Sequence, residues 1–210
     1  MSAERTWKET LSGLQAVEAD AMRAGELSRT AKRGEGGKMS ARGRIEYLLD
    51  TDSFAELNML AEHQCHDFGM ESKRVPGDGV VTGYGTIDGR QVFVYAEDDA
   101  VLGGSTGKTH GAKIHYILRL ARETRVPIIC LNASAGARIQ EGMDNVYGIT
   151  GMFRENILNS GVVPQIAAVM GTCTGGAAYS SALCDFVIQV ENRAPLFLIG
   201  PAVTLAPPKS

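Results

Sequence analysis

From residue 79 onward, short apolar segments alternate with helical patterns, and this alternation constrains the fold most strongly. Segments 126–131 and 165–170 are typical of buried strands, and each is followed by a run of very small residues and then a helical pattern. Strands that alternate with helices favour a largely parallel sheet. The sequence therefore predicts an α/β chain.

The remaining predicted elements follow from local signals. Asp88-Gly89 separates two β-rich runs, which is a strong hairpin signal. Along the chain we expect two units, an N-terminal helix and linker over 1–37 and a domain over 38–210 that contains the hairpin. Helices are predicted over 2–28, from Ser40 to about 49, over 108–124, up to about 159–161 and over 177–183. Further strands are predicted over 186–190 and 196–199. The linker is 32–38, and 61–77 is expected to be a loop.

Composition excludes several classes of protein. The 210 residues carry 21 Lys+Arg against 24 Asp+Glu, a net charge of −3, which argues against a nucleic-acid binder. No apolar stretch approaches the roughly 20 residues of a membrane span. The four cysteines are scattered, and the N-terminus is too acidic for a signal peptide. We therefore expect a cytoplasmic protein with reduced thiols.

Two strand-to-helix loops, 130–138 and 169–177, consist largely of Ala, Gly, Ser and Thr. Small residues let a ligand approach the backbone, and a helix that follows points free N–H groups at it. A phosphate or a developing oxyanion would suit such a place. Because these loops offer almost no acid, base or nucleophile, they favour a site built from backbone groups. The alternative is that the glycines only permit tight packing.

Other chemistries are less well supported. Loop 102–109 resembles a phosphate-binding P-loop, but Leu102 stands where the first glycine belongs. Ser134 lacks the surroundings of a nucleophile elbow. His110 and His115 are expected to be partly exposed helical residues, with His110 able to touch a phosphorylated ligand. His63, Cys65, His66 and Asp67 do not match an established zinc spacing, so we expect no metal.

Several blocks resemble the carboxyltransferase subunits of biotin-dependent acyl-CoA carboxylases. Residues 134–142, SAGARIQEG, are similar to that family's S-G-G-A-R-I-Q-E-G signature, and 38–45, KMSARGRI, to its K-L-T-A-R-E-R-I block. Further blocks match in the family's order: 79–85, 103–105, 160–165, 175–180 and 197–201. The likeness runs from about Lys38 to Pro201, and related subunits occur in sodium-pumping acyl-CoA decarboxylases.

The resemblance implies a crotonase-like superhelix of ββα units and a site without a protein base. Carboxybiotin on a carrier domain would supply carbon dioxide and the base, and acyl-CoA would be the substrate. The implied oxyanion donors are Ala135 and Gly136, at the start of a helix. The implied substrate-binding residues are Gly103, Gly104, Ser105, Ala137, Arg138, Gly175 and Gly176. The implied partners are a biotin carboxyl carrier, biotin carboxylase, a second carboxyltransferase domain and further copies of the chain.

Departures from the family keep alternatives open. Ala135 replaces a glycine, Thr172 replaces a proline, and the second domain that supplies the biotin half is not in the 210 residues. We therefore expect no carboxyl transfer without that domain. Alternatives are a decarboxylase subunit, a non-catalytic CoA-binding fragment, or a hydratase or thioesterase that uses Glu141, Asp144 or Glu155.

Overall fold

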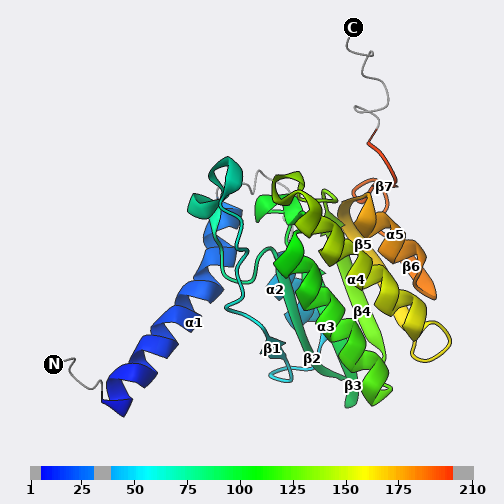
Figure 1. Ribbon diagram of the computed structural model, residues 1–210. Helices are drawn as coiled ribbons and strands as arrows, with labels where there is room; N and C mark the ends of the chain where they lie inside the picture. Colours follow the sequence, from blue (N-terminus) through cyan, green and yellow to red (C-terminus); the bar gives the residue numbers. More distant parts are fainter. Residues whose placement is uncertain (1–5, 31–38, 201–210) are drawn as a thin grey trace, which may run out of the picture.

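A mixed sheet forms the centre of the computed structural model, which describes residues 6–30 and 39–200 (Figure 1). Its strand order is β1-β2-β3-β4-β5-β6, with β7 paired to the end of β5. The first three strands are antiparallel, and β3 through β7 pair in parallel. The strands are β1 Ala55–Leu57, β2 Val80–Ile87, β3 Arg90–Glu97, β4 Ile128–Ser134, β5 Gln165–Thr174, β6 Phe186–Gln189 and β7 Leu196–Phe197. The predicted α/β class with a parallel-rich sheet is confirmed.

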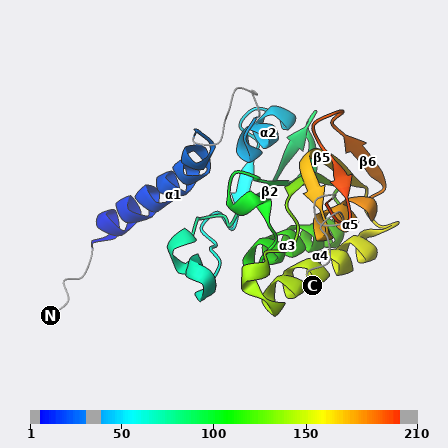
Figure 2. The same ribbon diagram turned by 90° about the horizontal axis from the view of Figure 1, so that it is seen from above.

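Helices cover both faces of this sheet (Figure 2). One face carries α3 (Lys108–Thr124) and α4 (Met143–Asn159), which pack against each other, and α5 (Gly176–Ala182) lies beside β5. The other face carries α2 (Ala41–Leu48). The two faces hold separate apolar cores, because alternate strand residues point to opposite sides.

Strand β4 shows how the sequence builds both cores at once. Ile128 and Cys130 belong to the core beneath α3, while Ile129 and Leu131 belong to the core beneath α2. A strand buried on both faces needs a continuous apolar run rather than an alternating one. This requirement explains why 126–131 could be identified from the sequence.

The hairpin and the helix that follows it match the predictions closely. Asp88 and Gly89 have φ of 49° and 74°, the left-handed pair that a two-residue type I′ turn requires. Helix α3 has the predicted bounds, and α4 ends at Asn159 as expected.

Other predicted bounds are wrong. Strand β5 extends to Thr174 and β4 to Ser134, because their small residues continue as extended backbone; Cys173 and Thr174 pair with β7. Much of both predicted loops is therefore strand. The predicted 61–77 loop contains the 3₁₀ segment η1 (Asp67–Lys73), and β1 was not predicted. The predicted linker 32–38 and residues 2–5 of the first helix lie outside the described residues.

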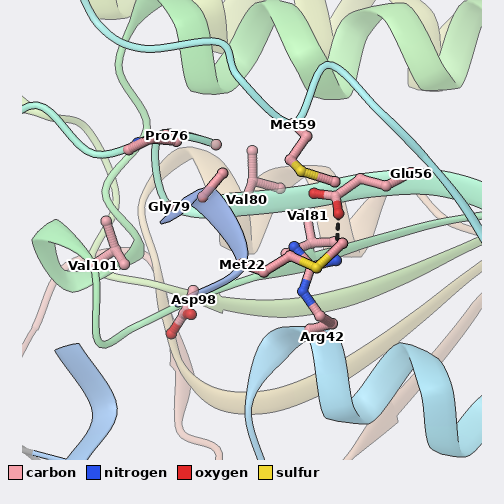
Figure 3. A pocket seen from close by; sticks show the side chains of 12 residues that line it. Met22, Arg42, Glu56, Met59, Pro76, Gly79, Val80, Val81, Asp98 and Val101 are labelled. Carbon is pink, nitrogen blue, oxygen red and sulfur yellow. Dashed lines mark hydrogen bonds and ion pairs between the residues drawn. The ribbon is translucent and has the colours of Figure 1, made fainter. Parts of the chain in front are cut away.

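The N-terminal helix α1 (Trp7–Thr30) extends away from the sheet and contacts the body near Ala21 (Figure 1). Ala21 and Met22 line a small cavity beside the Arg42–Glu56 ion pair (Figure 3). Its volume of about 30 Å³ is close to the space of one water molecule, so it is no binding site for a large ligand. In the described part of the chain, no helix combines the length and apolar character needed to cross a membrane.

Lys113 is a charged group within the α3 face. Its Nζ donates to the carbonyl oxygens of Gly77, at 2.9 Å, and Val80, at 2.5 Å. Burial lowers the pKa of Lys113 to about 8, although the charges of Glu56 and Asp78 oppose the shift. The folded protein therefore releases this proton at a lower pH than the unfolded chain does.

We predict that Lys113 makes stability rise with pH. Between a folded pKa of about 8 and the ordinary value of 10.5, only the unfolded state holds the proton, so raising the pH favours folding. The free energy of unfolding of the wild type, minus that of Lys113→Met, should rise by about 2 kcal/mol from about pH 7 to pH 10. Urea unfolding measures this difference, in which the titration of other groups cancels. If this difference does not change with pH, the lowered pKa of Lys113 is contradicted.

Candidate active site

Three short loops meet where β3, β4 and β5 end. They are loop A (102–107, after β3), loop B (134–138, after β4) and loop C (174–176, after β5). Neighbouring parallel strands bring their carboxyl ends to one edge of a sheet, which is the usual place for ligands in α/β proteins. The predicted site residues in these loops are therefore brought together.

Glycines allow the three loops to pack backbone against backbone. A Cβ on Gly104 would lie 2.3 Å from the carbonyl oxygen of Ala133, and a Cβ on Gly136 would lie 3.1 Å from that of Thr174. A Cβ on Gly175 would lie 3.8 Å from the Cα of Gly136. Gly104 and Gly136 therefore permit tight packing between the loops, which was the alternative to a ligand-binding role for these glycines.

Loops A and B are joined by backbone hydrogen bonds. The Ala135 N–H donates to the Gly103 carbonyl at 2.9 Å, and the Thr106 N–H donates to the Gly136 carbonyl at 2.7 Å. The Gly136 N–H donates to Ser134 Oγ at 3.2 Å. Both N–H groups that the resemblance assigns to the oxyanion are therefore used within the protein.

Ala137 has a different position. The Arg138 N–H donates to the Thr106 carbonyl at 2.9 Å, so Thr106 bonds to the residues on either side of Ala137. In such a parallel bridge the N–H of the middle residue points away from the partner strand. Ala137 is also exposed, and no described residue accepts a hydrogen bond from its N–H.

Loop C presents a second N–H at the start of a helix. Gly175 is the N-cap of α5 and Gly176 its first residue, and no side chain caps this end. The first N–H groups of a helix have no partner within it. Loop C thus leads directly into a helix, as predicted. Loop B does not, because α4 begins only at Met143 and the 3₁₀ turn η3 (Ile139–Glu141) intervenes.

Arg138, which the resemblance assigns to substrate binding, is buried and bonded within the protein. Its guanidinium contacts Asp78 Oδ1 at 2.6 Å and Glu141 Oε1 at 2.8 Å. It also donates to Ser105, at 3.2 Å to Oγ and 2.7 Å to the carbonyl oxygen. Its side chain is 1% exposed. Arg138 and Ser105 therefore fix loop B to loop A instead of facing a ligand.

The same two carboxylates close the N-terminus of α3. The Lys108 N–H donates to Glu141 Oε2 at 2.7 Å, and the His110 N–H donates to Asp78 Oδ2 at 2.9 Å. These N–H groups would have to bind a phosphate in a P-loop. Because carboxylates already hold them, the structure argues against a nucleotide site at this helix. His110 is completely buried, which contradicts the expectation that it is partly exposed.

The carboxylates proposed for a hydratase or thioesterase are also engaged. Glu141 is held by Arg138, and Asp144 lies 3.3 Å from Lys108 Nζ. Glu155 is completely buried between helices, 2.8 Å from Arg122 Nη2. Among the described residues, no group of three His, Cys, Asp or Glu side chains could hold a metal ion.

A hollow of about 560 Å³ adjoins the end of loop B. It is lined by residues 64–68, Lys108, Thr109, 139–142 and Asp144. Ligand pockets in proteins usually measure about 300–1,000 Å³, so this hollow is large enough for part of a cofactor-sized molecule.

Comparison with known proteins adds a family context. Residues 32–206 match the family model described as "Carboxyl transferase domain". The methylmalonyl-CoA decarboxylase subunit alpha of Veillonella parvula is 50% identical over 179 residues, covering 85% of this chain and 35% of the relative. The propionyl-CoA carboxylase beta chain of Cereibacter sphaeroides is 46% identical over 196 residues, covering 93% of this chain and 38% of the relative. The chain thus spans little more than a third of these curated relatives.

Solved structures show the same arrangement of elements. Transcarboxylase 12S, solved as a hexamer assembly with methylmalonyl-coenzyme A bound, has a TM-score of 0.83 and 41% identity; the match covers 95% of this chain and 39% of that one. The beta subunit of geranyl-CoA carboxylase from P. aeruginosa has a TM-score of 0.76 and 28% identity, over 94% and 37% of the two chains. These neighbours have the crotonase-like fold, so that fold prediction is confirmed.

We predict that removing the Arg138 charge will destabilise the protein strongly. Arg138→Met leaves Asp78 and Glu141 buried without their cation, and breaking a buried pair in this way costs about 3–5 kcal/mol. Urea unfolding at neutral pH measures the loss. Arg119→Met is the control, because Arg119 forms an exposed pair with Glu123 and should cost less than about 1 kcal/mol. Equal losses of stability in the two variants would contradict the role of Arg138 as the cation that compensates Asp78 and Glu141.

Proposed function

Because the chain belongs to the carboxyl transferase domain family, we propose that it forms the acyl-CoA-binding half of a biotin-dependent carboxyltransferase. The observation that carries this proposal is a pair of N–H groups, of Ala137 and Gly176, on two adjacent loops, for which the described residues offer no acceptor. A thioester oxygen is the part of an acyl-CoA that such a pair would bind. The substrate, the partners and the activity of the complete protein are all proposals.

The proposed mechanism depends on position and backbone electrostatics. The Ala137 and Gly176 N–H groups would hold the thioester oxygen, and they would bind it more tightly as it becomes negative when the α-proton leaves. One donor of this kind contributes about 10²–10³ in rate in a well-studied protease. Carboxybiotin, presented by a carrier, would supply the carboxyl group. The hollow beside loop B offers space for part of the CoA chain.

This assignment differs from the one that the resemblance implies. Ala135 and Gly136 would shape the site without donating to the substrate, since their N–H groups bond to Gly103 and Ser134. Gly103, Gly104 and Gly175 would form the walls of the site. Ser105 and Arg138 would hold loops A and B together on the side away from the ligand.

The direction of the reaction and the partners rest on the relatives. Curated relatives include both a carboxylase chain and a decarboxylase subunit, and the same thioester site serves either direction because both pass through the enolate. We propose a second carboxyltransferase domain, a biotin carboxyl carrier, biotin carboxylase and further copies of the chain as partners. We also propose a cytoplasmic location, which the four free cysteines support.

Calorimetric titration of the purified chain tests the proposal. We predict saturable binding of CoA and of propionyl-CoA, and no binding of Mg-ATP. The last expectation follows because the Lys108 and His110 N–H groups at the start of α3 are held by carboxylates. Binding of Mg-ATP without CoA would contradict the proposed function, and so would binding of neither ligand.

Substitution at Gly176 tests the oxyanion donor separately. Proline suits the first position of a helix but has no N–H, so Gly176→Pro removes the proposed donor while α5 can remain intact. The probe is a CoA thioether that ends in a nitronate, which mimics the enolate. Because a hydrogen bond to a charged group contributes about 1.5–3 kcal/mol, nitronate affinity should fall at least about tenfold, with CoA affinity nearly unchanged.

Gly176→Ala is the matched control. It adds the same Cβ, 2.9 Å from Ile149 Cγ2, but keeps the N–H. We expect it to bind the nitronate within about threefold of the wild type, a change below 1 kcal/mol. Equal loss in the alanine and proline variants would show that the Cβ, and not the N–H, decides binding.

A further inference from the structure

Glu97 is a buried carboxylate directly behind loop B. It is the last residue of β3 and is 1% exposed. Its Oε2 accepts a hydrogen bond from the Ala133 N–H at 2.9 Å. Ala133 lies near the end of β4 and immediately precedes loop B, so Glu97 holds the backbone from which that loop begins.

His110 fixes Glu97 in turn. The imidazole is completely buried, with Nδ1 2.9 Å from the Asp78 carbonyl oxygen and Nε2 3.4 Å from Glu97 Oε1. A carbonyl oxygen can only accept, so we assign a hydrogen to Nδ1. The contact between Nε2 and Glu97 Oε1 ties Glu97 to helix α3.

The backbone of Ala133 is thus contacted on both of its peptide groups. Glu97 bonds its N–H, and the close approach of Gly104 leaves no room for a Cβ beside its carbonyl oxygen. Ser134 Oγ donates to the Gly104 carbonyl at 2.6 Å. Three residues, 134–136, separate Ala133 from Ala137, and their side chains are too small to fix the position of this stretch by packing.

We propose that Glu97 and His110 are positioning residues for the thioester site. The pair sets the place of the Ala137 N–H through the Ala133 peptide, without touching the substrate. This inference rests on the proposed function, in which Ala137 donates to the thioester oxygen. It adds two residues from β3 and α3 to a site that otherwise consists of loop backbone.

The test compares two ligands that differ at the thioester oxygen. The affinity of the whole 210-residue chain is measured for CoA and for the nitronate thioether of CoA, and the nitronate/CoA affinity ratio reports the oxyanion donors. In Glu97→Leu, which cannot accept from Ala133, the ratio should fall at least about tenfold. In Glu97→Gln, whose amide can accept from Ala133 and donate to His110 Nε2, the ratio should return to within about threefold of the wild type.

Glu155→Leu is the matched control. Glu155 is as buried as Glu97 but lies among Arg122, Arg154 and His115 on the α3–α4 side. This substitution should lower thermal stability and leave the nitronate/CoA ratio unchanged. A purely structural role for Glu97 would give the same behaviour in Glu97→Leu, and that result would overturn the proposal.

A second measurement applies if Glu97→Leu does not fold. In His110→Gln, amide NMR should show a smaller nitronate-induced shift of the Ala137 resonance than in the wild type; an unchanged shift would overturn the proposal. The failure of the proposed function is distinguishable, because it would appear as wild-type protein that binds no CoA. If the wild type binds CoA and the nitronate/CoA affinity ratio of Glu97→Leu is unchanged, only the positioning role of Glu97 and His110 is rejected.

Discussion

The buried guanidinium of Arg138 is the interaction on which the site depends most. It joins the Asp78 turn, loop A and η3 through one planar group with several donors. Both of its carboxylate partners also accept from N–H groups in the first turn of α3. A single cation therefore compensates two buried acids, and those acids satisfy a helix end whose N-cap, Gly107, has no side chain to do so. Loss of this cation would disturb the helix and the loops together.

Around this cation the chain builds a polar layer between its apolar core and its glycine loops. Lys113 bonds the carbonyls of Gly77 and Val80, on either side of Asp78 and Gly79. His110 contacts the Asp78 carbonyl from α3 and reaches Glu97 at the end of β3. The layer is thus held from the helix side and the sheet side. The low-dielectric surroundings strengthen each bond, but they also make every unpaired member costly.

The sequence predicted the order of helices and strands well because local patterns encode it. The apolar runs of β4 and β5, the Asp88-Gly89 turn and the bounds of α3 are all local signals. The polar layer was missed because Asp78, Glu97 and Arg138 are far apart in the chain and meet only when the sheet forms. A signal did exist, since Glu97 directly ends an apolar run and a carboxylate there needs a partner. The oxyanion donors that we propose, Ala137 and Gly176, differ from the implied Ala135 and Gly136 because hydrogen bonding, which the sequence does not display, decides which N–H groups are already used.

A site built from backbone groups has a specific structural requirement. Glycine and alanine let a ligand reach the peptide N–H groups, but they give the loop no side chains that could fix its position. N–H donors on such loops therefore need other residues that fix the loop backbone from the side away from the ligand. These residues must be polar because they have to hydrogen-bond to peptide groups. Arg138, Glu97 and His110 meet this requirement from three different elements. Their burial is therefore consistent with a role in the site, since a residue that positions the backbone has to lie on the side away from the ligand.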